Sequence, residues 1–529
     1  MISARACLTW GVGLLLSLSV SAQQTPGAEP GSRSTADKAR FDVSEIRVLG
    51  NSVLARVEVE RAVYPFVGPN KTIDDLNAAR VALESAYHSQ GYGTVFVDLP
   101  EQRVVGGLIR LKVTEGRLEY VHVSGARYYS NAQILAAVPE ATAGAVPNLP
   151  KLQEEIAAVN AVTANRAVVP VLKAGSQPGT VDLSLNVQDR LPLRASLEFN
   201  NQQSEGTKPL RALASLGYDN LFGRFDQFSI QYQDSPQAPG EVGVLATSLA
   251  VHLYDGGPAL SMYYINSKTN VVSTGLGILG KGSIYGLRLP LTFVNRADFT
   301  STLTYGIDYK HYLQSINASP SELNTPIDYM MFSADYFGAW RSQRLQTSLD
   351  TSVNFGSPEI VNDPEEFGTA RYQGRPNFFY FRGNVAATYL LPGELHLTAR
   401  LGGQEALEPL VTYEYYSIAG ADGVRGYLEA EEFGDRAVKG TLQLASPQWH
   451  LFSGAVTDLF VYFDDGHLTF LAPLPGQPSH AELRSVGAGL DLLATRHFTS
   501  SVTWAYPLVA GPYTAAGDSR VLFVVRGSL

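Results

Sequence analysis

The spacing of hydrophobic residues divides the chain into two regions of different pattern, which meet near residue 190. Between 41 and 190, apolar residues recur at helical spacing in some stretches, such as Leu76, Ala79 and Leu83, and form short runs in others. From 191 onward, apolar and polar residues alternate over many short stretches that turn residues separate. Helical spacing interleaved with short apolar runs predicts an α+β region, whereas alternation predicts strands with two different faces.

The predicted elements of the α+β region occur in the same order twice. The run EIRVL before Gly50 is echoed by EYVHVS before Gly125, about 75 residues later. Such self-similarity indicates two copies of one small domain. The first copy is predicted as a strand at 41–49, helices at 56–66 and 73–90, and strands at 94–99 and 108–114; the second as a strand at 119–124, helices at 131–138 and 150–164, and strands at 167–173 and 180–188.

The alternating region from 191 to 529 is predicted to be a β-barrel that crosses a membrane. In the stretch 299–310, Leu303, Tyr305 and Ile307 share one face, and polar side chains share the other. Strands of this kind fit lipid on one side and water on the other. With about 10 residues per membrane strand plus turns, the region holds roughly 16 strands.

A large soluble β-sandwich or propeller also shows alternation and is the alternative to a barrel. Three features favour the barrel: the region has no convincing helix, its aromatic residues recur near strand ends, and the chain ends in a strand at 520–529. A last strand that pairs with the first leaves no open sheet edge. No run of 18 apolar residues occurs after residue 22, so a chain that crosses a membrane has to do so as a closed barrel.

The first 22 residues are predicted to be a cleaved secretory signal peptide. Arg5 precedes an apolar run from Leu8 to Val20, and a small-residue cleavage site ends at Ala22. Cys7 is the only cysteine and lies inside this peptide, which leaves the mature chain without disulfide or thiolate chemistry. Residues 23–40 are rich in Gly, Pro, Ser and Ala and are expected to be flexible. The net charge of −10 does not suit a nucleic-acid partner.

Little in the sequence points to catalysis. The stretch GLGILGKG (275–282) approaches a phosphate-loop pattern, but a strand-like stretch at 283–294 follows it instead of a helix, and we interpret it as a flexible loop. The nine His are scattered without metal-ligand spacing, and no Gly-x-Ser-x-Gly elbow occurs. We therefore expect no enzyme activity, no cofactor and no metal.

Six stretches of the chain resemble motifs of one known family. They are GYGTVFVDLPEQRVVGGLIRLKVTEGRLEYVHVSG (91–125), GYDNLFGRFD (217–226), EYYSIAGADGVRGY (414–427), YFDDG (462–466), VGAGLDL (486–492) and WAYPL (504–508). In these motifs, their order and their spacing, the chain resembles the two-partner-secretion transporters (TpsB), the ShlB/FhaC/HecB-type haemolysin activator/secretion proteins of the BamA-like superfamily. The resemblance covers nearly the whole chain after the signal peptide.

The resemblance implies a definite fold. Two periplasmic POTRA domains, at 41–117 and 118–190, would precede a transmembrane antiparallel β-barrel of about 16 strands at 191–529. A long loop at about 414–440 would fold back into the barrel lumen. Many members of the family begin with a plug helix, but none is expected here, because 23–40 has no apolar helical face.

The resemblance also assigns a contact between the tip of this loop and the barrel wall. Arg425 of the tip would meet Asp464 of the wall, and a guanidinium can hold a carboxylate through two parallel hydrogen bonds. Without the resemblance, Arg425 would be an ordinary loop cation and Asp464 an ordinary luminal acid. The candidate residues are Val424, Arg425, Gly426 and Tyr427 at the tip and Tyr462, Asp464 and Gly466 on the wall.

The function that the resemblance implies is export of a dedicated partner across the outer membrane. A secreted exoprotein, TpsA-like and either an adhesin or a haemolysin, would bind the POTRA domains, with strand addition to a sheet edge as the recognition mode. It would then pass unfolded through the barrel to the cell surface. The other partners implied are outer-membrane lipid and the barrel-assembly machinery that inserts the protein. The alternatives are an assembly factor of the same superfamily and a passive porin or receptor.

Overall fold

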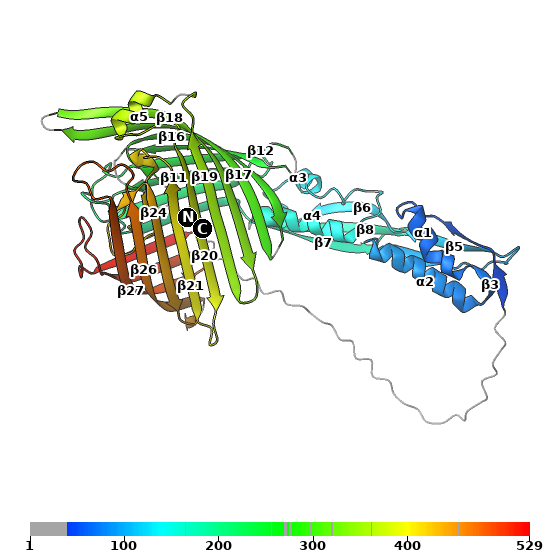
Figure 1. Cartoon of the computed structure of the whole chain (residues 1–529). Helices are drawn as coiled ribbons and strands as arrows, with labels where there is room; N and C mark the ends of the chain where they lie inside the picture. Colours follow the sequence, from blue (N-terminus) through cyan, green and yellow to red (C-terminus); the bar gives the residue numbers. More distant parts are fainter. Residues whose placement is uncertain are drawn as a thin grey trace. The chain divides into compact units, whose positions relative to one another are not determined.

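The computed structural model describes residues 40–529 except 164, 255–256, 269–271, 274–277, 297, 319–320, 361 and 453. The predicted signal peptide and residues 23–39, with the question of a plug helix, lie outside the described residues. The chain forms two compact units, Met1–Leu191 and Pro192–Leu529, which are described separately (Figure 1). No helix among the described residues is long and apolar enough to cross a membrane.

The first unit contains the predicted repeat. In each copy, a first strand runs parallel to the last, and an edge strand pairs antiparallel to that last strand, giving the sheet orders β2-β5-β4 and β6-β8-β7. The elements are β1 (Phe41–Val43), β2 (Glu45–Leu49), α1 (Arg56–Val63), η1 (Tyr64–Phe66), β3 (Gly68–Lys71), α2 (Ile73–Ser89), β4 (Val95–Asp98), β5 (Leu108–Glu115), β6 (Arg117–Ser124), α3 (Asn131–Ala136), α4 (Leu149–Val162), β7 (Arg166–Ala174) and β8 (Thr180–Asp189).

Local sequence explains the ends of these elements. Helix α2 begins at a capping box in which the Thr72 side chain accepts from the backbone of Asp75 and Asp75 accepts from the backbone of Thr72. Gly50 and Gly125 end the first strand of each copy with φ of +91° and +83°, a conformation that favours glycine. Strand β3, which pairs with β1, was not predicted from the sequence. The single strand predicted at 41–49 is two strands, β1 and β2, in the structure.

The second unit is a closed antiparallel barrel, which confirms the predicted fold (Figure 1). Its wall has 16 strands within the described residues; the short strand β25 (Trp449–Phe452) pairs beside them with β26. The wall strands are β9 (Leu193–Asn200), β10 (Arg211–Leu221), β11 (Asp226–Asp234), β12 (Val244–His252), β13 (Ala259–Ser267), β16 (Gly282–Asn295), β17 (Phe299–Ala318), β18 (Ser321–Arg341), β19 (Leu345–Gly356), β20 (Phe379–Leu390), β21 (His396–Ala406), β24 (Arg436–Ala445), β26 (Ala455–Thr469), β27 (His480–Thr495), β28 (Phe498–Pro507) and β29 (Arg520–Ser528).

Barrel closure follows the predicted pairing of the ends. The last strand, β29, pairs antiparallel with the first, β9, from Val524 opposite Asn200 to Ser528 opposite Ser196. Closure removes both open edges of the sheet, so every wall strand has a neighbour on each side.

The predicted alternation gives each strand an apolar outer face and a polar inner face. On β17, Tyr305 and Ile307 are exposed on the outside, whereas Asp308 and Lys310 are buried. On β26, Phe463 is exposed and Asp464 is fully buried. Because successive residues of a strand point to opposite faces, the buried polar residues line the interior.

Two features of the barrel differ from the sequence expectation. Strands β17 and β18 span 20 and 21 residues, about twice the length that crosses a bilayer. A helix, α5 (Pro364–Ala370), lies in the connection from β19 to β20, where no helix was predicted. Its seven residues make only two turns with one buried side chain, which gives little hydrophobic periodicity, but its Asp363 cap, Pro364 and first-turn acids are helix-start signals.

The glycine-rich stretch at 275–282 falls partly outside the described residues. Of it, Ile278–Leu279 forms β15, paired with β14 (Val272–Ser273), and Gly282 begins β16. A strand follows this stretch, as predicted, and not a helix.

Candidate functional site inside the barrel

The connection between β21 and β24, residues 407–435, packs against the inner face of the barrel. It contains η2 (Thr412–Glu414) and the short strands β22 (Tyr416–Ser417) and β23 (Phe433–Gly434), which pair with each other. Most of its side chains are buried, including Ile418, Val424 and Tyr427. We call this segment the luminal loop, because its partners on the wall are inward-facing residues.

The tip of the luminal loop is a tight turn held by its own backbone. The Val424 N–H donates to the carbonyl of Ile418 at 2.7 Å, and the Gly423 N–H donates to the carbonyl of Gly420 at 3.0 Å. Gly420 and Gly426 have φ of +102° and +99°, which side chains larger than hydrogen rarely adopt. The turn directs Arg425 at the wall.

Arg425 and Asp464 meet in a two-pronged ion pair. Arg425 Nε lies 2.7 Å from Asp464 Oδ2, and Nη2 lies 2.9 Å from Oδ1. The backbone N–H of Arg425 also donates to Oδ2, at 3.1 Å. The side chain of Asp464 is 0% exposed and that of Arg425 is 11% exposed. This contact is charge-assisted, bidentate and almost fully buried. It therefore belongs to the strongest class of side-chain hydrogen bonds.

Two further side chains of the barrel wall contact the guanidinium. Its Cζ lies 3.3 Å from the ring centroid of Tyr462, a cation–π contact. Its Nη1 donates to Gln443 Oε1 on β24 at 3.2 Å. We call Arg425, Asp464, Tyr462 and Gln443 the tip anchor.

The glycines of both motifs allow the close approach. A Cβ on Gly466 would lie 2.9 Å from Val424 Cγ2, so this position of β26 leaves room for the loop. A Cβ on Gly426 would lie 3.2 Å from the side chains of Ala505 and Pro507. Tyr427 donates from its hydroxyl to the carbonyl of Val509 at 2.6 Å. The structure thus brings all seven predicted site residues together; their functional role stays a prediction.

A second contact, at the start of the luminal loop, was not predicted. Glu414 is 1% exposed and Lys310 is 7% exposed, and Lys310 Nζ lies 2.5 Å from Glu414 Oε1. Tyr329 donates to the same oxygen at 2.5 Å, and Tyr380 donates to Oε2 at 2.7 Å. The ring of Tyr413 stacks on an aromatic ring of the barrel wall, with the two ring centroids 3.8 Å apart. We call Glu414, Lys310, Tyr329 and Tyr380 the base anchor.

The far end of the luminal loop is tied to other loops by carboxylates. Asp435 is fully buried and accepts from the backbone N–H groups of Leu410 at 2.7 Å and Leu471 at 2.8 Å. Arg371, just after α5, donates to the carbonyl of Leu471 at 2.6 Å and lies 3.7 Å from Asp435. Glu431 accepts from the backbone and hydroxyl of Thr514 at 2.7 and 2.6 Å. The barrel interior is therefore filled by a loop with several fixed points.

The described residues hold no group of three or more His, Cys, Asp or Glu placed to bind a metal ion. The acids and bases of the arrangement are used in ion pairs and backbone contacts, so what it supports chemically is the holding of a loop.

Comparisons with known proteins place both units. Residues 41–116 match the ShlB-type POTRA domain, and residues 179–492 match the haemolysin secretion/activation proteins ShlB/FhaC/HecB. The outer membrane transporter CdiB of Dickeya dadantii is 23% identical over 88% of this chain and 83% of its own length. The heme/hemopexin transporter protein HuxB of Haemophilus influenzae is 20% identical over 89% of this chain and 84% of its own.

Solved structures show the same fold. CdiB from Escherichia coli superposes with a TM-score of 0.66 at 20% identity, over 95% of this chain and 93% of that one. BamA from Haemophilus ducreyi lacking POTRA domains 1–3 has a TM-score of 0.56 at 14% identity, over 92% and 100% of the two chains.

Proposed function

The chain belongs to the ShlB/FhaC/HecB family of haemolysin secretion/activation proteins, and from this we propose that its luminal loop gates the export of one dedicated exoprotein. As a two-partner-secretion transporter it lies in the outer membrane, with its POTRA domains in the periplasm. The partner would be a TpsA-like adhesin or haemolysin, bound by the POTRA domains and passed unfolded through the barrel. The family is one of transporters, and we propose no catalytic step.

The observation that carries this proposal is a barrel interior occupied by an anchored loop. The tip anchor and the base anchor hold the luminal loop to β26 and to β17, β18 and β20. A passive porin keeps an aqueous channel through its barrel. A loop with discrete, dry contacts to the wall instead supports a pore that opens when cargo shifts the loop between two packings.

The β4 edge of the first POTRA sheet offers few free backbone groups to a cargo strand. On the edge strand β4, the Val97 N–H donates to Glu84 at 3.1 Å, and the Val97 carbonyl accepts from Arg80 at 3.3 Å. His88 lies 3.1 Å from the carbonyl of Val95. Side chains of α2 therefore occupy the backbone groups that an added strand would need.

The β7 edge of the second POTRA sheet is covered over only part of its length. Asn160 of α4 binds both backbone groups of Val168 on β7, at 2.7 and 3.0 Å. Alternation along an antiparallel strand turns the backbone of Pro170 and Leu172 to the same open side. Pro170 has no N–H to donate, so the outward donors of this stretch are Leu172 and, at the end of β7, Ala174. We place the recognition of a cargo strand at the distal half of β7.

The test compares secretion by cells that carry the protein with secretion by cells that lack it. One large species should disappear from the culture supernatant of cells without the protein. In the Leu172→Pro variant, which loses an outward N–H of an edge strand that tolerates proline, secretion should fall at least several-fold. Leu172→Thr keeps the N–H and serves as the matched control.

Two results would overturn the proposal. An unchanged supernatant in cells without the protein would remove the export function. Loss of other outer-membrane barrels from those cells would instead favour an assembly factor, to which the BamA likeness points only in fold. Equal secretion by the proline and threonine variants would remove β7 as the recognition edge but leave export standing.

A further inference from the structure

The connections of the barrel fall into two sets. The chain enters the barrel from the POTRA unit at β9, so the start of β9 lies at the periplasmic rim. Because neighbouring strands are antiparallel, the turns from β16 to β17 and from β18 to β19 lie at the same rim. They are next to each other, because β17 and β18 pair along their full length.

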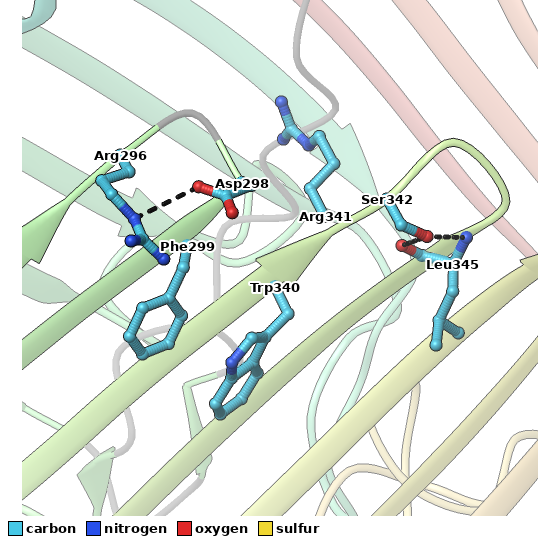
Figure 2. Close-up of a pocket in the computed structure, with 7 residues that line it drawn as sticks. All are labelled: Arg296, Asp298, Phe299, Trp340, Arg341, Ser342 and Leu345. Atoms are coloured by element: carbon cyan, nitrogen blue, oxygen red, sulfur yellow. Dashed lines mark hydrogen bonds and ion pairs between the residues drawn. The ribbon is translucent and has the colours of Figure 1, made fainter.

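A shallow cavity of about 320 Å³ opens between these two turns (Figure 2). Phe299 and Trp340 are register partners and stack with their centroids 5.1 Å apart. Trp340 and Leu345 are each 41% exposed. In Figure 2 these three side chains point the same way, out from the strands, and form an apolar wall. Aromatic side chains at this height are typical of the zone where acyl chains meet head groups.

The polar margin of the cavity is basic. Arg296 and Asp298 form an exposed pair at 3.4 Å, and in Figure 2 the Arg296 guanidinium hangs beside the ring of Phe299. Arg341 and Arg344 lie in the second turn. Across the described ranges, neither has an ion-pair partner. Three arginines against one aspartate leave the two turns with a net charge of +2.

Another turn at the periplasmic rim carries an exposed tryptophan but no charged residues, and it serves as a comparison for this cavity. Trp449 lies in the turn between β24 and β26 and is 46% exposed, like Trp340. Its turn, SPQWHLFSG (446–454), contains His450 but no Lys, Arg, Asp or Glu. The two tryptophans therefore lie at the same rim with similar exposure, one in a turn that contains unpaired cations and one in a turn without charged residues.

We propose that the cavity at Phe299 and Trp340 is a binding site for an anionic phospholipid of the periplasmic leaflet. The acyl chains contact the wall of Phe299, Trp340 and Leu345. The phosphate group lies at the basic margin that Arg296, Arg341 and Arg344 form, whose net charge with Asp298 is +2. A guanidinium suits this ligand, because its planar donors match phosphate oxygens and it stays charged at every physiological pH.

The two tryptophans permit a direct test in the full-length protein. Of the four tryptophans, Trp10 lies in the signal peptide and the others are Trp340, Trp449 and Trp504. One variant keeps only Trp340 (Trp449→Phe, Trp504→Phe), and its control keeps only Trp449 (Trp340→Phe, Trp504→Phe). Each is folded into phosphatidylcholine vesicles that carry a small fraction of phosphatidylglycerol, with bromine on the acyl chains of one lipid or the other.

Bromine quenches tryptophan fluorescence only at contact, so the quenching reports which lipid lies beside each ring. Brominated phosphatidylglycerol should quench Trp340 at least twofold more than the same fraction of brominated phosphatidylcholine. For Trp449 the two lipids should quench equally. Adding Arg296→Gln, Arg341→Gln and Arg344→Gln should abolish the preference at Trp340. Heat-dependent gel mobility, which separates folded barrels from unfolded chains, checks that each variant is folded.

Two outcomes would overturn the proposal. Equal quenching of Trp340 by both lipids would show that no anionic lipid is enriched there. The same preference at Trp449 would show that the whole rim attracts anionic lipid and that the arginines form no site. Both readings come from lipid contact alone, so they are independent of whether the protein exports a partner.

Discussion

The two anchors of the luminal loop use the same kind of contact but are encoded differently. The tip anchor joins two compact motifs and Gln443 of β24, and one arginine supplies the three hydrogen bonds that Asp464 accepts. The base anchor joins one glutamate to donors on three different strands, β17, β18 and β20. The contacts of the tip anchor therefore all pass through one side chain, Arg425, whereas the donors of the base anchor come from three strands of the wall.

This difference suggests an order of release. The side chains of the two pairs are about equally buried, with 11% and 0% exposure for Arg425 and Asp464 and 9% and 2% for Lys310 and Glu414. Separating either pair leaves a buried charge without compensation, so the expected order follows from the number of side chains and strands that hold each anchor. We expect the tip to move during export while the base stays fixed as its hinge.

The largest effect is expected from Glu414→Ala. This change leaves Lys310 buried without a carboxylate, which costs about 3–5 kcal/mol for a buried pair. Hydrogen exchange of residues 407–418 should become much faster, because local opening then requires less free energy. The matched control is Glu405→Ala, whose exposed pair with Arg436 at 3.0 Å should contribute about 0–1 kcal/mol. Equal hydrogen exchange of residues 407–418 in both variants would show that the base anchor does not stabilise the luminal loop.

A slightly smaller effect is expected from Arg425→Ala. The barrel should still insert, but the buried Asp464 loses its partner at a cost of about 3 kcal/mol. Secretion should fall sharply, and hydrogen exchange should rise at 419–430 and not at 407–418. Arg425→Lys keeps the charge but not the two parallel bonds, so it should be intermediate. Wild-type secretion by Arg425→Ala would contradict the proposed lock.

The same contrast explains what the sequence could reveal. The contact between Arg425 and Asp464 was predictable because each lies in a short motif that resembles one of the family, and the resemblance implied that they meet. For the base anchor, alternation placed Lys310 on the polar face of its strand but could not supply its partner, which lies 104 residues away. Side-chain partners across a barrel depend on the path of a loop, and periodicity carries no information about that path.

For a related reason, the fold was easier to predict from the sequence than the site. Strand number and the repeat of one α+β unit follow from local period and length, and the structure shows both. Helix α5 was missed because two turns with one buried residue, Phe367, give too little periodic signal. Local pattern thus predicts long elements well, short ones poorly, and contacts between distant segments only where a motif marks both sides.

A moderate effect is expected at the glycine that lets the tip approach the wall. In Gly466→Ala the new methyl group would lie 2.9 Å from Val424 Cγ2 and 3.1 Å from Ile418 Cβ, so overpacking should cost about 1–3 kcal/mol. Hydrogen exchange should rise at the tip and leave the base unchanged. Adding Val424→Ala removes the nearer clash and should recover part of the loss. A double variant with the simple sum of the two losses would show that they do not touch.

The smallest effects separate the donors of the base anchor from one another. Glu414 Oε1 accepts from both Lys310 and Tyr329, whereas Oε2 accepts from Tyr380. Tyr329→Phe therefore leaves Oε1 with a charged donor and should cost about 0.5–1 kcal/mol. Tyr380→Phe leaves Oε2 buried without that bond and should cost about 1–3 kcal/mol. Hydrogen exchange of 407–418 measures both on one scale. Because the two tyrosines are fully buried and each loses only a hydroxyl, each variant serves as the control of the other. The reverse ranking would mean that the carboxylate turns toward Tyr329 in solution, and the base would then depend on fewer strands than the structure shows.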